Sequence, residues 1–178
     1  MNFLEKNKRK FDKLDSPENE GDNYKKLIKL EEEYDLKLPA ELKLLYSFLE
    51  EYEINPDYCY LSIDILDTEI EFDGFYPILT KQTQEETFFS GLKPKSYPGD
   101  ELAKTHKQSC GEYPEGWSAD KKNDYMPLAE SSSDVILMGI GTTNYGEIFL
   151  WEFHGDEIEN PTKIFSSLPE MIDSFIEY

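Results

Sequence analysis

His154 is the residue whose type and neighbours best suit acid–base or metal chemistry. It stands at the end of an apolar run, among three carboxylates, Glu152, Asp156 and Glu157. An imidazole beside carboxylates can act as a general acid or base, or it can bind a metal ion. The alternative is a histidine at the solvated end of a strand, where nearby carboxylates favour its charged form. We favour this alternative and predict no catalytic residue, with an enzyme using His154 as a third hypothesis for function.

The other reactive side chains suggest no chemical centre. His106 and Cys110 are four residues apart, but a zinc site needs three or four ligands and usually paired cysteines. Cys59 lies in an alternating apolar pattern and is expected to fill the core. The glycines of residues 139–146 lack the lysine and the following helix of a phosphate loop, so we interpret them as turn formers. We therefore predict no metal and no cofactor.

The net charge of the chain limits the classes of partner that it can bind. Thirty-eight acids and eighteen bases give a formal charge of −20. Duplex nucleic acid and anionic membranes are poor ligands for this surface, because phosphate binding needs a basic footprint. The negative field would instead attract a basic protein. Residues 1–14, with five bases and two acids, are expected to form a helical or frayed surface end.

Size and cysteine content indicate the class of protein. A chain of 178 residues is long enough to bury a core as one domain. Its longest apolar run, residues 135–140, is too short to span a membrane, and the first residues lack the apolar core of a secretory signal. Two cysteines suit free thiols in a reducing compartment. We expect a cytoplasmic protein without a membrane segment.

The hydrophobic pattern predicts three helices. Residues 24–34 and 39–52 carry apolar side chains at helical spacing, and Pro39 suits a first turn. A third helix begins with a capping box, in which Ser167 and Glu170 each bind a backbone amide. Its apolar stripe comprises Leu168, Met171, Ile172 and Phe175.

Strand patterns fill most of the remaining chain. They cover residues 58–66, 69–79 with a turn at Asp73-Gly74, 125–129, 135–140 and 147–153. The segment 135–140 is apolar on both faces, which predicts a central strand, and it forms a hairpin with 147–153. Trp151 is expected to be buried against the last helix. The order of elements predicts an α+β fold, a mostly antiparallel sheet flanked by helices.

The domain division follows from the same patterns. We expect one domain over residues 1–178, with an N-terminal extension at 1–23. Residues 80–124 are rich in proline and glycine and are expected to form a loop-rich insertion, because the apolar patterns on either side need each other to close a core.

Three motifs carry a family resemblance. Residues 30–42 are LEEEYDLKLPAEL, where a Leu-Pro step separates two helices. The strand block contains MPLA at 126–129, DVILM at 134–138 and YGEIFLWEFH at 145–154. The closing segment at 165–175 is FSSLPEMIDSF. In this order and spacing the motifs resemble the SUKH superfamily, which comprises the fungal cell-wall-assembly regulator domain and many bacterial relatives.

The resemblance implies a non-catalytic α+β interaction protein. In bacteria it implies an immunity protein that neutralises a toxin, often a nuclease, by direct binding, so the expected partner is a basic toxin domain. The alternative is a regulatory binding module similar to the fungal cell-wall (glucan) synthesis regulator.

The acidic side chains indicate two candidate surfaces for binding the partner, and the sequence leaves the choice between them open. The first lies on the two predicted helices and comprises Glu31, Glu32, Glu50 and Glu51. The second lies at the end of the predicted hairpin, within residues 144–157, and comprises Tyr145, Glu152, His154, Asp156 and Glu157.

Overall fold

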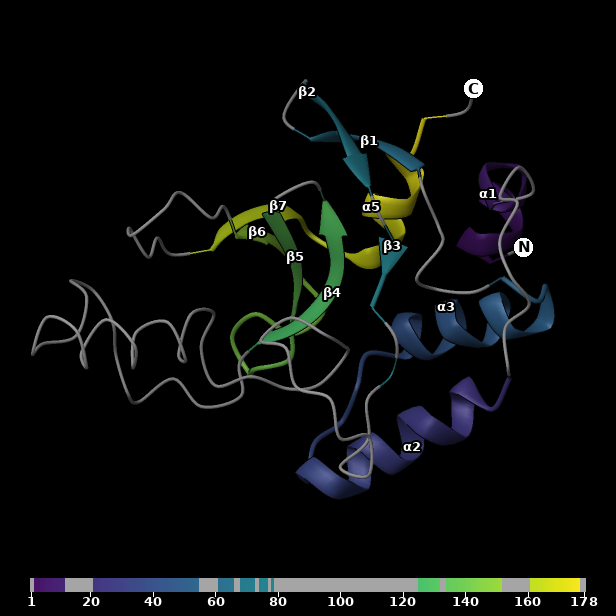
Figure 1. Ribbon diagram of the computed structural model, residues 1–178. Helices are drawn as coiled ribbons and strands as arrows, with labels where there is room; N and C mark the ends of the chain where they lie inside the picture. Colours follow the sequence, from purple (N-terminus) through teal and green to yellow (C-terminus); the bar gives the residue numbers. More distant parts are fainter. Residues whose placement is uncertain are drawn as a thin grey trace, which may run out of the picture.

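The computed structural model describes residues 2–11, 21–54, 61–65, 68–72, 74–76, 78, 125–131, 134–151 and 161–176. Within these ranges the helices are α1 (Phe3–Phe11), α2 (Asn23–Tyr34), α3 (Ala40–Glu51) and α5 (Leu168–Asp173). The strands are β1 (Leu61–Ile65), β2 (Thr68–Phe72), β3 (Gly74–Phe75), β4 (Tyr125–Ser131), β5 (Asp134–Gly139), β6 (Ile148–Trp151) and β7 (Thr162–Phe165). Figure 1 shows the helices gathered beside the sheet. The predicted α+β class is confirmed.

The described strands form two antiparallel sheets. β1 pairs with β2, and the larger sheet has the order β3-β4-β5-β6-β7. The predicted hairpin between β5 and β6 is confirmed, and β5 is the central strand of the larger sheet. The turn predicted at Asp73-Gly74 is wrong as a hairpin turn, because β2 pairs with β1 whereas β3 pairs with β4. Between Phe72 and Gly74 the chain passes from one sheet to the other.

A proline explains an irregularity inside the larger sheet. β4 has partners on both sides, yet Pro127 has no amide hydrogen to donate. The pairing with β5 shifts register between Pro127 and Ala129, as in a β-bulge. The pairing with β5 resumes at Ala129, opposite Ile136, and on the other side of β4 the Tyr76 amide donates to the carbonyl of Leu128 at 2.9 Å.

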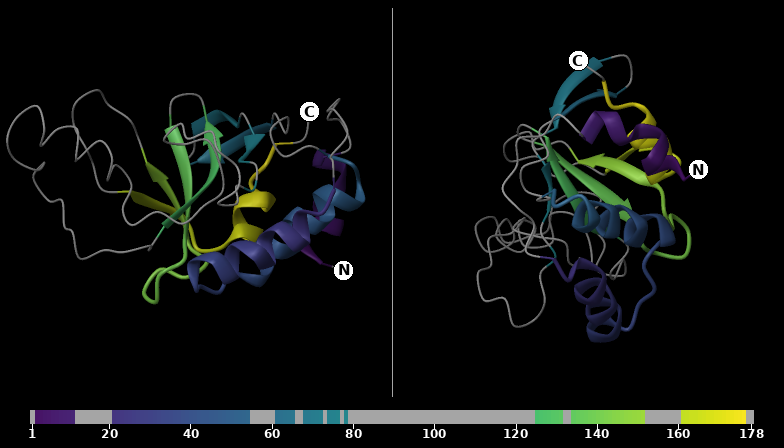
Figure 2. Two further views of the ribbon diagram at one scale, coloured as in Figure 1. Left: turned by 60° about the horizontal axis from the view of Figure 1, so that its bottom comes forward. Right: turned by 90° about the vertical axis from the view of Figure 1, so that its right-hand side faces the viewer.

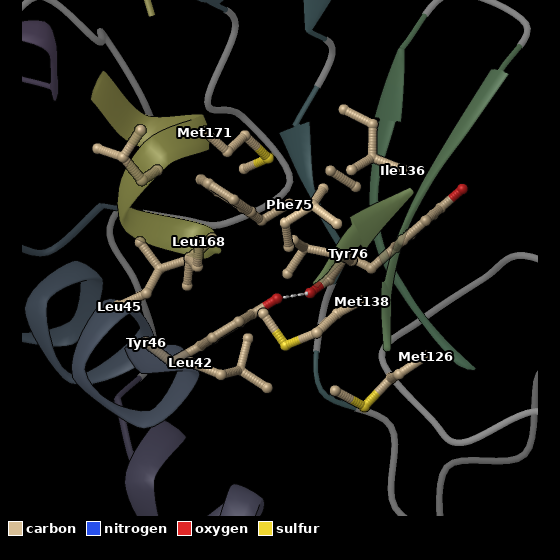
Figure 3. Close-up of a cluster of buried hydrophobic side chains, with 14 of the residues drawn as sticks. Leu42, Leu45, Tyr46, Phe75, Tyr76, Met126, Ile136, Met138, Leu168 and Met171 are labelled. Atoms are coloured by element: carbon tan, nitrogen blue, oxygen red, sulfur yellow. Dashed lines mark hydrogen bonds between the residues drawn. The ribbon is translucent and has the colours of Figure 1, made fainter. Parts of the chain in front are cut away.

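The core lies between the helices and one face of the larger sheet (Figure 3). Leu42 and Leu45 of α3, Met171 of α5 and Met138 of β5 all belong to this cluster, and all four are buried. Tyr46 also lies in this layer, where its hydroxyl donates a hydrogen bond to the carbonyl of Tyr76. This bond joins α3 to the segment that follows β3.

The position of Trp151 is partly as predicted. Its side chain is 1% exposed, so its burial is confirmed. Its place against the closing helix is wrong. Trp151 pairs with Val135, and Phe149 pairs with Leu137, whereas Ile136 and Met138 alternate to the other face. Since that other face meets α3 and α5 in Figure 3, Trp151 belongs to the opposite side of the sheet.

The closing helix has the predicted cap and stripe. The Glu170 amide donates to Ser167 Oγ at 3.4 Å, and Glu170 Oε2 accepts from the Ser166 amide at 2.7 Å. Four apolar side chains of this segment are buried: Leu168, Met171, Ile172 and Phe175. Because α5 spans only Leu168–Asp173, Phe175 lies beyond it, in a β-bridge with Ile63.

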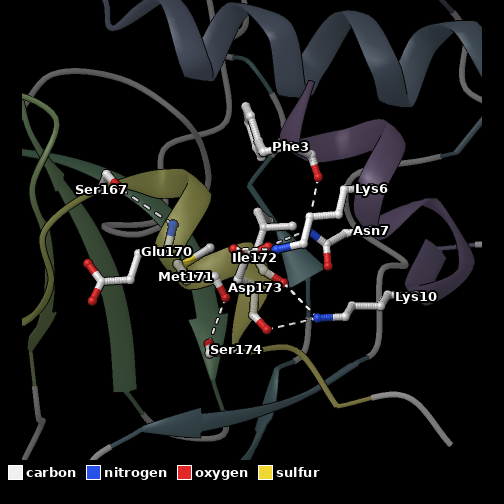
Figure 4. A network of polar contacts seen from close by, with 10 residues as sticks. All are labelled: Phe3, Lys6, Asn7, Lys10, Ser167, Glu170, Met171, Ile172, Asp173 and Ser174. Atoms are coloured by element: carbon white, nitrogen blue, oxygen red, sulfur yellow. Dashed lines mark hydrogen bonds and ion pairs between the residues drawn. The ribbon is translucent and has the colours of Figure 1, made fainter. Parts of the chain in front are cut away.

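The N-terminal helix α1 packs on the end of α5 (Figure 4). Lys10 Nζ donates to the carbonyls of Ile172 and Asp173, at the C-terminal end of α5, at 3.2 and 2.9 Å. The Asp173 carboxylate accepts from Asn7 Nδ2 at 2.6 Å and binds Lys6 Nζ at 3.0 Å. The basic residues of α1 therefore complement the negative end of α5.

Candidate functional site

Part of the predicted partner surface lies outside the described residues. This applies to Glu152, His154, Asp156 and Glu157, so the possible chemistry of His154 stays a hypothesis. The cysteines and His106 also lie outside them. In the portion of the chain that is described, no three His, Cys, Asp or Glu side chains come together as metal ligands.

Glu50 is used to complete a neighbouring helix. Its Oε1 accepts from the Asp22 amide at 2.9 Å, and its Oε2 accepts from the Asn23 and Tyr24 amides at 2.8 and 3.4 Å. Asp22 precedes α2 in a left-handed conformation, φ 64°, and its side chain makes no capping bond to this helix. A carboxylate from the end of α3 thus caps the start of α2.

Glu31 holds the opposite ends of the same two helices together. Its Oε1 accepts from the Leu38 amide and from Lys43 Nζ, each at 2.7 Å. The Glu31 and Lys43 side chains are only 15% and 19% exposed, so this ion pair is partly shielded from water. Glu31 therefore fixes the Leu-Pro connection, whereas Glu32 and Glu51 point to solvent.

The end of α2 concentrates negative charge. Glu31, Glu32 and Glu33 occupy its last turn, where the helix dipole already places a partial negative charge. Lys43 pairs with Glu31, and Lys29 lies 3.7 Å from Glu33. Glu32 and the following Asp35 are exposed. The exposed carboxylates of Glu32 and Asp35 add negative charge at a helix end where it is unfavourable for the helix itself.

A tightly wrapped turn presents Tyr145 near this acidic end. The Gly146 amide donates to the carbonyl of Gly139 at 2.9 Å, and the Gly141 amide donates to Asn144 Oδ1 at 2.9 Å. Only glycine fits at 139, where a Cβ would lie 2.0 Å from the Asn144 carbonyl oxygen. Gly146 has φ +79°, which side chains disfavour. The interpretation of these glycines as turn formers is confirmed.

The turn, α3 and α5 enclose a pocket of about 220 Å³, which we call the Tyr145 pocket. It is lined by Pro39, Glu41, Met138, Tyr145, Gly146, Ser166, Ser167 and Leu168. In Figure 2 the green turn between β5 and β6 lies close to the beginning of α3. The lining comes from four separate segments of the chain, and those segments belong to the three motifs identified in the sequence.

Tyr145 links the pocket to the acidic helix end. Its side chain is 47% exposed although it is aromatic. Partial burial raises the pKa of the Tyr145 phenol above its ordinary value, the Lys43 ammonium opposes the rise, and the Glu31 and Glu41 carboxylates add to it. The phenol is therefore neutral at physiological pH and keeps its hydrogen as a donor.

Comparison with models of protein families assigns the chain to a family. The family model described as the SMI1 / KNR4 family (SUKH-1) matches residues 25–174. The chain belongs to the SMI1/KNR4 family. The resemblance to the SUKH superfamily is thereby confirmed, and α1 lies before the matched segment. No curated protein and no solved structure matched the chain significantly. Family membership indicates an interaction protein with an immunity or regulatory role, in a family that is generally non-catalytic.

No helix in the described ranges is long and apolar enough to cross a membrane.

Several pocket residues were missing from the sequence-based list of binding residues. Of the lining residues, only Tyr145 belongs to the two partner surfaces predicted from the sequence. Glu41 had a signal, because it lies two residues after Pro39 of the Leu-Pro step, and Ser167 had one as a helix cap. Neither signal indicates a shared pocket, since more than a hundred residues separate the two positions in the sequence.

Proposed function

We propose that this SMI1/KNR4-family protein acts by stoichiometric binding of a protein partner in the cytoplasm, as an immunity protein that blocks a basic toxin domain. A toxin that grips nucleic acid presents a cationic groove, and an acidic protein would be steered toward it and would occupy it. The formal charge of −20 supports this type of partner and opposes direct binding of nucleic acid.

One observation carries the proposal: an exposed aromatic residue beside exposed acidic side chains. The fold uses the carboxylates of Glu31 and Glu50 for its own connections, whereas Glu32 and Glu41 are exposed. Tyr145 stands next to this acidic end on a turn held by backbone hydrogen bonds. Tyrosine is favoured at binding hot spots because a large ring contributes contact area at low entropic cost.

The test is a binding measurement with the toxin domain encoded beside this gene. We expect a one-to-one complex whose association rate falls at least tenfold as the salt concentration is raised. The reason is that the Debye length shortens from about 8 Å at physiological salt to about 3 Å at 1 M salt. The dissociation rate should change much less, since close contacts set it. Stopped-flow mixing across a salt series measures both rates.

Two outcomes would contradict the proposal. An association rate that is indifferent to salt would remove electrostatic capture. A His154→Ala variant that loses protection while keeping stability and partner affinity would support an enzyme instead. The proposal expects this variant to protect as the parent protein does.

A further inference from the structure

We propose that the Tyr145 pocket receives an arginine side chain of the protein partner. The inference rests on the proposed function, because it names the chemistry by which a basic partner would be held at this site. A pocket of about 220 Å³ suits one long side chain rather than a helix or a strand.

The pocket has an apolar floor and an aromatic wall. Pro39, Met138 and Leu168 are buried members of its lining, so they offer a hydrocarbon surface to the methylene groups of an arginine. The half-exposed ring of Tyr145 stands at the edge and can stack on the guanidinium plane. A hydroxyl from Ser166 adds an acceptor at the rim.

The charge around the pocket selects a cation. Glu41 is the one charged side chain among the described lining residues, and it is exposed. The nearby Lys43 ammonium is neutralised by Glu31 at 2.7 Å and does not cancel Glu41. A carboxylate can accept two parallel hydrogen bonds from a guanidinium, a geometry that lysine cannot provide.

An anion would find few free donors at the same place. The amides of Ser166 and Glu170, at the beginning of α5, already donate within the capping box, to Glu170 Oε2 and to Ser167 Oγ. The Glu170 carboxylate itself lies next to the Ser166 backbone. A phosphate or carboxylate ligand would therefore be repelled.

The test uses N-acetyl-arginine amide as the probe, titrated into the full chain and followed by two-dimensional NMR. We expect saturable shifts of the Tyr145, Gly146 and Ser166 signals. N-acetyl-citrulline amide has the same shape without the charge and should bind about tenfold more weakly, the size expected for losing a charge-assisted hydrogen bond. Equal shifts from both probes, or no saturable shift with arginine, would overturn the inference.

Matched variants separate the pocket from the general field. Glu41→Gln should weaken arginine binding about tenfold, and Tyr145→Ala should also weaken it. Glu53→Gln removes the same charge at the other end of α3 and should leave it unchanged. If Glu53→Gln weakened binding as much as Glu41→Gln, the pocket would not be the site.

The two proposals fail in different ways. A toxin complex that forms although arginine does not bind the pocket would reject this inference and leave the immunity role intact. Saturable arginine binding without any toxin complex would support the pocket and reject the immunity role.

Discussion

Removing the Glu50 carboxylate should destabilise the protein, although Glu50 lies on an acidic helix where a binding role was also predicted. The proposed change is Glu50→Ala, which leaves the Asp22 and Asn23 amides without their carboxylate partner. Glu51 is the matched control, since it is the next residue on α3 and is exposed.

The expected magnitude follows from the capping contacts. Loss of a helix N-cap costs about 0.5–2 kcal/mol, and a carboxylate near a helix N-terminus adds about 0.3–1 kcal/mol. Because Glu50 is only partly buried and water can reach the freed amides, we expect about 2 kcal/mol for Glu50→Ala. Surface substitutions without such contacts stay within about 0.5 kcal/mol, which is the expectation for Glu51→Ala.

Urea unfolding followed by circular dichroism measures both variants. Glu50→Gln adds a further comparison, because an amide oxygen can accept the same bonds without the charge, and it should lose less stability than Glu50→Ala. Equal stability of Glu50→Ala and Glu51→Ala would refute the capping role. Glu50 would then again be a candidate for binding the partner.

Three further substitutions test other parts of the structure. Trp151→Ala should cost about 3–5 kcal/mol, and a thermal melt like that of the parent protein would place this ring at the surface. Gly139→Ala should disrupt the turn that carries Tyr145, since its Cβ would meet the Asn144 carbonyl; unchanged NMR shifts of residues 140–146 would contradict this. Hydrogen bonds from Asn7 and, to a smaller extent, Lys6 lower the pKa of Asp173 from its ordinary value of 3.8. The ionised Asp173 therefore stabilises the folded state above pH 3.8, and this stabilisation is lost as the pH falls through the lowered pKa. The hydrogen-exchange protection factors of α1, measured relative to the intrinsic exchange rate at each pH, should therefore fall in acid, and Asp173→Asn should remove much of that pH dependence.

The sequence was most informative where local chemistry decides the structure. The apolar periodicity of 24–34 and 39–52 matches α2 and α3 within one residue at each end. The capping box placed the start of α5 at Leu168. The four-residue strand β7 (Thr162–Phe165) was missed, because Thr-Lys-Ile-Phe is too short to show an alternating pattern.

Features that depend on pairing between distant segments could not be predicted from the sequence. The Asp73-Gly74 dipeptide is typical of a hairpin turn, but β3 pairs with β4 about fifty residues later in the chain. The face of Trp151 depends on the register between β5 and β6, which a period-two pattern cannot give when both faces are apolar. The same limit applies to Glu50, whose capping role cannot be predicted from its neighbours because its partners precede it by 26–28 residues.

The geometry of α2 and α3 also changes how the two predicted partner surfaces relate to each other. The helices are antiparallel, because Glu50 at the end of α3 contacts the start of α2, and Glu31 at the end of α2 contacts the start of α3. Tyr145, which was assigned to the hairpin surface, lies near Glu31 and Glu41. The hairpin surface and the acidic end of α2 therefore adjoin at the Tyr145 pocket, whereas Glu50 and Glu51 lie at the far end of α3, roughly 15 Å away at 1.5 Å per residue. We therefore expect charge reversal of Glu32 and Glu41 to slow association with the toxin domain more than reversal of Glu51, and stopped-flow rates that rank these positions in the opposite order would move the binding face to the other end of the helices.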